Sequence, residues 1–583
     1  HRPTTFDGTF SRIVENGDGT KTAWMGENEP YNRTKGMVGL TVPPDRSYVR
    51  AEVSLYNGTP VARPFLWWAN LAVEINENYS VVFPPDVEYV NDHDRRAVLS
   101  WPVAKGRFDT ARPYDYGTGK DIHYHRNIVV PSSFMVSKGQ SDSDFLCGYD
   151  LGKQCGTVTV ANHYIAPGKK LWTWGNNPFG YKWCSNLTDD GSRYVELMTG
   201  CYADNQPDFT YIAPYETKRF TQYWYPVHDI GEVKNATIDA AVNLEKEGRG
   251  CKVGFCVTGV FDNCRIEVRD KGRLVLEARA DLSPEKTWIG HACCTLKAGT
   301  SAALFDQNGN CLVRNEVCER GSRKPVEPRI PSPRPKDIPT VEELYLHGKH
   351  IVQYKHFTLD AKDFYEEGLR RDPADARCNE GMGDLLYDQG RFAEALKYYD
   401  RAEERLELRN ANPENTDVLY KRGLCKRALG MDKDAYQDLY WSVWSFKNRS
   451  AGYYALAGLA CKRGDIKESI RLLKLSLETN VRHLWAQNML AELTGDTSYT
   501  QKIDKEDPLF DAFRNDAGQA LDLAIELMRF GLYARAIAVL EGASPSVMND
   551  YYLSYLYKKT GDAKKSAAAK KRGDKRSWVY CNP

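Results

Sequence analysis

Residues 194–226 read YVELMTGCYADNQPDFTYIAPYETKRFTQYWYP, and this stretch places a carboxylate where a β-strand usually carries an apolar side chain. With the two-residue period of a strand, Val195 and Leu197 share one face, while Glu196 lies on the other. The strand is followed by polar side chains suited to hold hydroxyl groups: Asp204, Asn205, Gln206 and Asp208. We therefore expect a strand with one face in the core and the other in a sugar site.

The length and charge of the chain limit its organisation and its partners. At 583 residues it is too long for one core, and ordinary domain sizes predict about three or four domains. The formal net charge is +1, so overall electrostatics give no reason to expect nucleic acid or an anionic membrane surface as a partner. No run approaches the roughly 18 apolar residues of a membrane-spanning helix. A neutral partner fits better.

The cysteines indicate a reducing compartment. There are 15, an odd number, spread irregularly and without a CxxC pair that would suggest zinc. Reduced structural thiols fit this pattern, which predicts a cytoplasmic location. His123 and His125 have the i, i+2 spacing of two metal ligands on a strand. The sequence places no third ligand beside them, so neither a metal nor another cofactor is predicted.

The composition and the residue patterns of the sequence divide the chain into a β part and an α part. Residues 1–235 are rich in Tyr, Trp, Val and Thr, with turn signals at strand-like intervals, which predicts a first β domain. Residues 236–322 contain short alternating runs and two glycine turns, typical of a small β-sandwich. Residues 323–339 carry six prolines without an apolar period, and we expect them to form a semi-rigid linker.

Residues 340–583 show an internal repeat. The set Gly423, Gly430, Ala435 and Leu439 recurs as Ala457, Gly464, Ser469 and Leu473. The offset is 34 residues, the tetratricopeptide period, and small residues stand where paired helices approach closely. The pattern predicts an α-solenoid whose concave face offers a surface for a protein partner or a longer glycan.

Two further stretches resemble the strand around Glu196, because aromatic and polar residues alternate with apolar ones. They are PFLWWANLAVE at residues 64–74 and KKLWTWG at residues 169–175. The alternation gives four candidate sugar-binding residues: Trp68, Asn70, Trp172 and Trp174. Indole faces stack on pyranose rings while amides and carboxylates bind hydroxyl groups, so this composition is typical of a glycan groove. Packing between sheets would produce the same alternation.

The candidate acid and base have alternative interpretations. His93 is flanked by carboxylates that would raise its pKa and suit it to proton donation, but a loop histidine exposed to solvent gives the same pattern. Glu196 is either a catalytic base or a carboxylate paired with Arg193 or Lys218 at the edge of a strand.

These residues carry a resemblance to a known family. The stretch PFLWWANLAVEINENYSVVFPPDVEYVNDHD at residues 64–94, PGKKLWTWG at residues 167–175 and residues 194–226 are similar to the bacterial domain of unknown function DUF5107. That domain is often joined to tetratricopeptide repeats and is related to the galactose-mutarotase-like super-sandwich, which the resemblance implies for residues 1–235. HRPTTF at the start resembles an internal family motif, and the repeats end without a polar capping helix. We therefore expect a fragment that lacks N-terminal strands and C-terminal repeats.

The relationship to aldose mutarotases also implies roles for individual residues. In those enzymes a Glu in an E…Q…PD-like segment is the base at the anomeric hydroxyl, and Glu196 with Gln206-Pro207-Asp208 is similar to it. The mutarotase motif Asn-His-x-Tyr-Phe-Asn is matched only in part by residues 67–70, which contain no histidine. His1, in the HRPTTF motif, is a further candidate substrate-binding residue.

The function predicted from the sequence is carbohydrate-active. A glycan would bind in the tryptophan-lined groove, with Glu196 as base at or near the anomeric carbon, as in a glycoside hydrolase or an epimerase. The acid would be His93 or a histidine of a missing segment. The alternative is a non-catalytic glycan-binding or scaffold protein whose repeats dock a protein partner. A pure protein adaptor is a third possibility, and it would bind no sugar.

Overall fold

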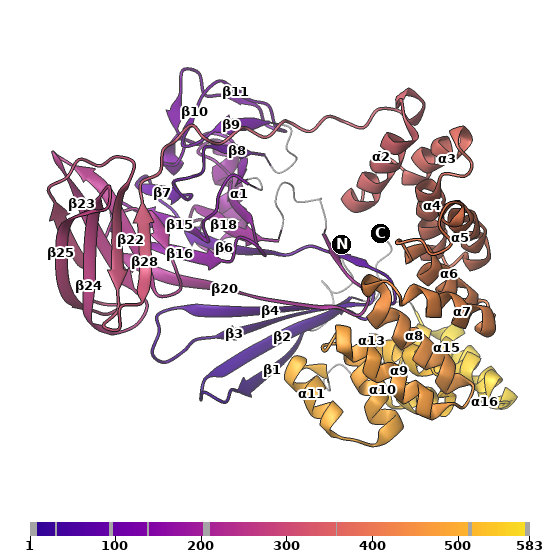
Figure 1. The fold of residues 1–583 in the computed structure, drawn as a ribbon. Helices are drawn as coiled ribbons and strands as arrows, with labels where there is room; N and C mark the ends of the chain where they lie inside the picture. Colours follow the sequence, from indigo (N-terminus) through magenta and orange to yellow (C-terminus); the bar gives the residue numbers. More distant parts are fainter. Residues whose placement is uncertain are drawn as a thin grey trace.

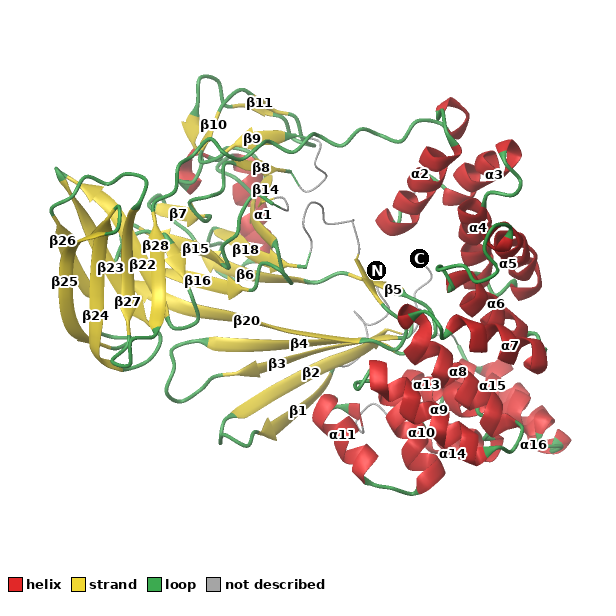
Figure 2. Ribbon diagram, viewed as in Figure 1, coloured by secondary structure: helices red, strands yellow, loops and turns green. Residues whose placement is uncertain are grey.

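The computed structural model describes residues 9–29, 32–92, 97–136, 139–201, 210–356, 358–510 and 516–577. A small β-sandwich, a larger β domain and a curved array of helices lie in a row, with the larger β domain in the middle (Figure 1, Figure 2). The predicted order of β domains, linker and helical solenoid is confirmed. None of the helices in these ranges combines the length and apolarity needed to span a bilayer.

The larger β domain contains a long antiparallel sheet, called sheet A. Its described strands are, in spatial order, β1 (Phe10–Glu15), β2 (Lys21–Glu29), β3 (Thr34–Thr41), β4 (Val49–Asn57), β20 (Thr217–His228), β16 (Cys155–Ala161), β15 (Phe145–Asp150) and β7 (Tyr79–Val82). The long strand β20 joins the two halves of the sheet, because it pairs with β4 along its first part and with β16 along its last. Strands β1–β4 extend toward the helices (Figure 1).

A second antiparallel sheet, called sheet B, packs over the β15–β7 end of sheet A. Its described strands are β6 (Trp68–Glu74), β18 (Tyr194–Gly200), β17 (Gly168–Thr173), β14 (Ser132–Val136), β8 (Tyr89–Asn91) and β9 (Val98–Ser100). Leu71, Leu197 and Leu171 lie opposite one another across three strands and face the core, where Val81 and Leu146 of sheet A meet them. Strand alternation therefore turns the intervening residues to the other side, called the open face.

Short strands extend the edges of this domain. They are β5 (Arg63–Phe65) with β19 (Thr210–Ile212), β10 (Val103–Ala104) with β13 (Lys120–Asp121), and β11 (Arg107–Phe108) with β12 (Tyr114–Asp115). Phe108 and Ala104 are buried in the same core as sheet B. We call residues 103–121, which carry the last four of these strands, the excursion. Because Phe108 and Ala104 anchor it, its turn at residues 109–113 is held at the edge of sheet B.

The small sandwich consists of two antiparallel sheets. One contains β21 (Asn235–Ala236), β22 (Ala240–Glu247), β23 (Gly250–Val257) and β26 (Trp288–Ala292), and the other β25 (Arg273–Leu282), β24 (Phe261–Asp270), β27 (Thr300–Phe305) and β28 (Cys311–Glu316). Phe255 and Val253 of the first sheet meet Ile266 and Leu304 of the second in its core.

The proline-rich segment is attached to the larger β domain at its beginning. The Arg320 guanidinium donates to the carbonyl of Val87 at 2.9 Å, and the Glu88 carboxylate accepts the backbone N–H of Gly321 at 2.8 Å. Arg323 forms an ion pair with Asp142 at 2.8 Å. The start of the predicted linker is therefore held by specific contacts that its composition did not suggest.

The helices form antiparallel pairs. Their bounds are α2 (Val341–Tyr354), α3 (Ala361–Arg371), α4 (Ala376–Asp388), α5 (Phe392–Glu407), α6 (Asp417–Ala428), α7 (Asp432–Ser442), α8 (Arg449–Lys462), α9 (Ile466–Thr479), α10 (Leu484–Thr494), α11 (Ser498–Glu506), α13 (Ala517–Arg529), α14 (Tyr533–Gly542), α15 (Val547–Lys559) and α16 (Ala563–Lys575). A Cβ on Gly423 would lie 2.7 Å from the Leu439 side chain, so only a small residue allows this approach. Gly430 has φ +79° in the turn between α6 and α7.

The inner helices of the array hold two turns of the larger β domain. The hydroxyl of Tyr420 in α6 donates to the carbonyl of Pro60 at 2.7 Å, and Trp485 Nε1 in α10 donates to the carbonyl of Gly58 at 3.2 Å. The Tyr215 ring stacks on His483 with a centroid separation of 4.4 Å. We call this contact region the docking interface.

Charged pairs reinforce the docking interface. Lys35 of β3 and Asp507 form an ion pair in which both side chains are buried. Arg33 pairs with Asp522 of α13 and lies 3.4 Å from Glu526. Part of the concave face is thus occupied by this chain itself. A protein partner on that face stays a prediction.

Candidate functional site

The open face of sheet B brings together residues from three strands. Glu196 of β18 lies directly opposite Trp172 of β17 on one side and Ala72 of β6 on the other. One step along the sheet, Lys170, Met198 and Asn70 form the next row. The predicted Trp172, Glu196 and Asn70 therefore lie on one face, because adjacent antiparallel strands keep paired residues on the same side.

Glu196 is half-buried and bound to an amide. Its Oε2 atom accepts a hydrogen bond from Asn70 Nδ2 at 2.7 Å. The basic residues considered as alternative partners have other partners, since Arg193 pairs with Glu77 at 2.8 Å and Lys218 with Glu216 at 3.0 Å. The Glu196 carboxylate thus shares the open face with an amide and an indole.

A short helix builds an aromatic wall next to this row. Helix α1 (Pro178–Leu187) begins after Asn177, whose side chain accepts the backbone N–H of Gly180. Phe179 and Trp183 stand four residues apart and so lie on one side of the helix. The Trp183 ring stacks parallel to Trp174, with centroids 5.1 Å apart, and Trp172 meets Trp174 edge-on at 5.3 Å.

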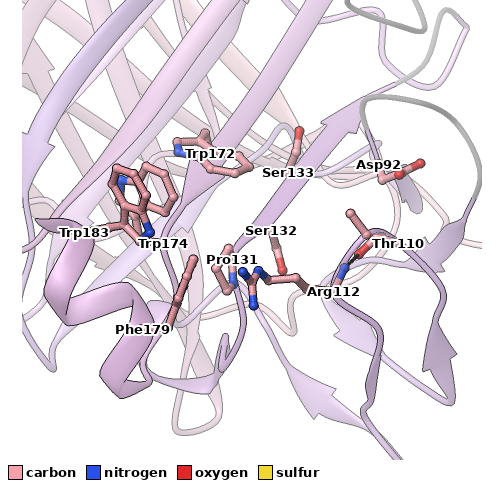
Figure 3. A pocket seen from close by; sticks show the side chains of 11 residues that line it. Asp92, Thr110, Arg112, Pro131, Ser132, Ser133, Trp172, Trp174, Phe179 and Trp183 are labelled. Carbon is pink, nitrogen blue, oxygen red and sulfur yellow. Dashed lines mark hydrogen bonds between the residues drawn. The ribbon is translucent and has the colours of Figure 1, made fainter.

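These rings line a pocket with a volume of about 200 Å³ (Figure 3). Its lining residues are Asp92, Thr110, Ala111, Arg112, Pro131, Ser132, Ser133, Trp172, Trp174, Phe179 and Trp183. Phe179 and Trp183 are each 39 % exposed, so both side chains are partly accessible from solvent. We call this site the aromatic pocket.

The wall opposite the indoles comes from the turn of the excursion between β11 and β12, at residues 109–113. Arg112 extends from this turn toward Phe179, and its guanidinium carbon lies 3.8 Å from the ring centroid (Figure 3). Thr110 Oγ1 accepts the backbone N–H of Arg112 at 3.2 Å and shapes the turn. Asp92, at the end of β8, closes the far side.

The predicted site residues are distributed in three ways. Trp172 and Trp174 line the aromatic pocket, whereas Glu196 and Asn70 lie in the adjoining rows of the open face. Trp68 lies at the β6 edge, where the Lys170 ammonium is 5.5 Å from its ring centroid. The remaining predicted residues lie outside the described part of the chain: His1, His93, Asn205, Gln206 and Asp208.

The two spaced histidines have separate structural contacts. His125 Nε2 lies 2.7 Å from Thr173 Oγ1 beneath sheet B, and burial lowers the pKa of His125 to about 4. Burial alone would also lower the pKa of His123, but hydrogen bonds to Glu232 and Asp121 raise it above its ordinary value. Within the described ranges, no three His, Cys, Asp or Glu side chains are grouped to hold a metal ion.

The sequence did not assign Phe179, Trp183, Arg112 or Asp92 to the site. A usable signal was present for the first two, because Asn177-Pro178 is a helix start and aromatic residues follow at an i, i+4 spacing. No local pattern marks Arg112, which reaches the pocket only through the fold of the excursion.

Comparison with known families follows the same division of the chain. Residues 1–227 match the model of a domain of unknown function, DUF5107. The chain carries a DUF5107 domain. Residues 235–314 match the second domain of YphG-like proteins, and residues 358–413 and 381–440 match tetratricopeptide repeats. The DUF5107 domain thus contains sheets A and B and the aromatic pocket.

The similarity of this chain to solved structures is weaker than its match to the family models. A TPR-domain containing protein from Parabacteroides distasonis is 15 % identical, and the match covers 96 % of this chain and 76 % of that one with a TM-score of 0.34. A candidate aldose 1-epimerase from Klebsiella pneumoniae is 9 % identical over 38 % of this chain and 54 % of its own, with a TM-score of 0.26. At such TM-scores neither likeness bears on function.

Proposed function

We propose that the DUF5107 domain binds a carbohydrate on the open face of sheet B, with one sugar ring in the aromatic pocket. The pocket, at about 200 Å³, is smaller than the roughly 300–1,000 Å³ of sites for drug-sized ligands, which suits a single ring. Trp172, Trp174 and Trp183 offer aromatic faces and edges to the C–H groups of such a ring.

The observation that carries this proposal is the juxtaposition of indoles with hydroxyl-binding groups. Trp172 belongs to the pocket and stands directly opposite Glu196, which Asn70 orients through its amide. A sugar that stacks on the indoles and extends along the open face would present hydroxyl groups to the carboxylate and the amide. A purely structural aromatic cluster would not need that polar row beside it.

The chemistry we propose is proton transfer at or near the anomeric carbon, with Glu196 as base. A carboxylate that is hydrogen-bonded to a neutral amide remains available to accept a proton from a sugar hydroxyl. The resemblance to the mutarotase segment assigns the same role to Glu196, and the sequence assigns His93 as acid. Glycoside hydrolysis and epimerisation both need such a pair.

The substitution Glu196→Gln tests the catalytic part. It keeps the shape and the hydrogen bond with Asn70 but removes the base, so turnover should fall by about 10²–10⁴-fold while sugar binding persists. Glu74→Gln is the matched control, because Glu74 is an exposed carboxylate on the same face of β6. Unchanged turnover in Glu196→Gln would contradict the assignment.

The alternative is a glycan-binding or scaffold protein without catalysis, whose repeats dock a protein partner. The docking interface supports it, since the repeats already bind turns of the β domain through backbone carbonyls and an aromatic stack. If the unsubstituted protein binds a glycan but turns over no member of a broad panel of glycosides, this alternative is favoured.

We also propose a cytoplasmic location. The cysteines in the described residues are free thiols, and most of them are buried in cores. Such thiols fit a reducing compartment. Fractionation of cells that produce the protein would test this location directly.

A further inference from the structure

Arg112 is oriented by an aromatic ring at the mouth of the pocket. Its guanidinium carbon lies 3.8 Å from the centre of Phe179, and the turn that carries it is shaped by the hydrogen bond to Thr110. A guanidinium that stacks flat on a ring keeps its N–H edge free for other partners. Figure 3 shows the side chain reaching from the excursion toward the aromatic wall.

Arg112 also differs from neighbouring arginines in its charge partners. Arg107, on the same excursion, pairs with Asp109, and Arg193, just before β18, pairs with Glu77. Within the described part of the chain, Arg112 forms no ion pair with a carboxylate. Asp92, the acidic residue that lines the pocket, is turned toward its own loop, where its Oδ1 atom accepts the N–H of Ala97 at 3.3 Å.

We propose that the pocket takes an acidic sugar, a uronic acid residue whose carboxylate binds Arg112 while its ring stacks on the indoles. This inference rests on the carbohydrate-binding function proposed above and specifies its substrate class. The planar guanidinium presents two parallel N–H groups, which match the two oxygens of a carboxylate. The aromatic wall and Arg112 line the same small pocket, so one ring with a carboxylate substituent contacts both.

The charge arrangement also selects against other ligands. A cationic sugar would be repelled by Arg112, and a neutral sugar would leave the guanidinium without a charged partner. Phosphate and sulfate also match the guanidinium fork through two of their oxygens, but as free ions they carry no ring that could stack on the indoles. The carboxylate of a uronic acid satisfies both the charge and the geometry.

The experiment compares sugars that differ only in the oxidation state of carbon 6. The affinities of methyl glucuronide and methyl galacturonide for the full chain are measured by calorimetry beside those of methyl glucoside and methyl galactoside. At least one uronide should bind about 10–100-fold more tightly than its neutral counterpart, as expected for a charge-assisted bidentate pair. The preference should weaken as salt is added, because the pocket is open to solvent.

Variants of Arg112 test whether the preference for the uronide over the neutral sugar comes from this side chain. Arg112→Gln should remove the preference for the uronide over the neutral sugar. Arg112→Lys should keep only part of this preference, because the planar fork is lost. Arg107→Gln is the matched control on the same excursion and should change neither affinity. Arg112 is exposed, so circular dichroism should show folded variants.

The outcomes separate this inference from the function on which it rests. Equal affinity for uronide and neutral sugar would overturn the inference and leave carbohydrate binding intact. A uronide preference that survives in Arg112→Gln would also overturn it. If inorganic sulfate competes as well as the uronide, the site is a simple anion site and the inference fails. Binding of neither sugar class would overturn both proposals.

Discussion

The docking interface and the aromatic pocket use similar residues in opposite ways. In the docking interface, Lys35 and Asp507 are buried as a pair and Trp485 donates its N–H to a backbone carbonyl. In the pocket, Trp183 and Phe179 remain more than a third exposed, and Arg112 contacts a ring without a carboxylate. Aromatic and basic residues occur in both regions. Among the described residues, Lys35 and Arg33 of the docking interface have carboxylate partners, whereas Arg112 of the pocket has none.

This difference separates architecture from recognition. A buried charge requires a partner because its desolvation costs several kcal/mol, so the paired residues of the docking interface fix the position of the helices. Exposed aromatic faces and an oriented guanidinium gain partners only when a ligand arrives. The same comparison predicts that mutations in the two regions affect different properties of the protein.

The largest effect is expected for Lys35→Met in the docking interface. The substitution leaves the buried Asp507 carboxylate without its ammonium partner, so the free energy of unfolding should fall by about 3–5 kcal/mol. Denaturant titration followed by the circular dichroism of the helices measures the change.

The double variant Lys35→Met/Asp507→Leu is the control for this effect. It removes both charges and should recover most of the lost free energy, since a buried ion pair is often replaceable by apolar residues. A single variant within about 1 kcal/mol of the parent would show that the pair does not hold the interface.

The second largest effect is expected from acid, which should weaken the docking interface. Burial lowers the pKa of His483 to about 3, whereas the unfolded residue titrates near its ordinary value of 6.5. Below pH 6.5 the unfolded state therefore binds a proton that the folded state does not. The free energy of unfolding should fall as the pH drops from 6.5 toward 3, by up to about 1.4 kcal/mol per pH unit.

The substitution His483→Asn assigns this pH dependence. Asparagine also caps helices, so it replaces the hydrogen bond that His483 Nδ1 accepts from the Ala486 N–H at 3.2 Å. The slope between pH 6.5 and 3 should become shallower in denaturation curves. An unchanged slope would place the dominant titration elsewhere, for example at His125.

In the pocket, Trp172→Ala should affect binding more than folding. Removal of a central aromatic contact costs about 2 kcal/mol, so the affinity for the sugar should fall roughly 30-fold. Trp444→Ala is the control, because Trp444 is 68 % exposed and stacks on Trp441 outside the pocket. Equal losses of sugar affinity in the two variants, measured by calorimetry, would show that Trp172 makes no specific contact with the sugar.

The smallest effect is expected at the rim of the docking interface. Arg63 pairs with Asp388 at 3.1 Å, but the Asp388 side chain is largely exposed. Arg63→Gln should therefore change the free energy of unfolding by less than about 1 kcal/mol. A loss comparable with that of Lys35→Met would mean that burial does not decide the strength of these pairs.

The sequence was sufficient to predict the order of the β domains, the linker and the helical repeats, and the faces of the central strands. The period of two in residues 194–200 puts Leu197 in the core and Glu196 on the open face, as the pairing with Leu171 and Trp172 shows. The 34-residue offset likewise identifies helix pairs in which Gly423 packs against Leu439. Local periodicity determines these features.

Features that depend on tertiary packing were not predictable in this way. Arg112 reaches the pocket because the excursion of residues 103–121 folds back on sheet B, and nothing near Arg112 in the sequence signals this. The docking interface joins Lys35 to Asp507, which are separated by 472 residues. A single sequence contains no pattern that links positions so far apart.

A crystal structure of the full chain soaked with mixed neutral and acidic oligosaccharides tests the central claim most directly. We expect a sugar ring stacked on Trp172 and Trp174 in the aromatic pocket, with the chain extending along the open face toward Asn70 and Glu196. A sugar bound only on the helices, or an aromatic pocket that stays free of sugar at saturating concentration, would contradict the account.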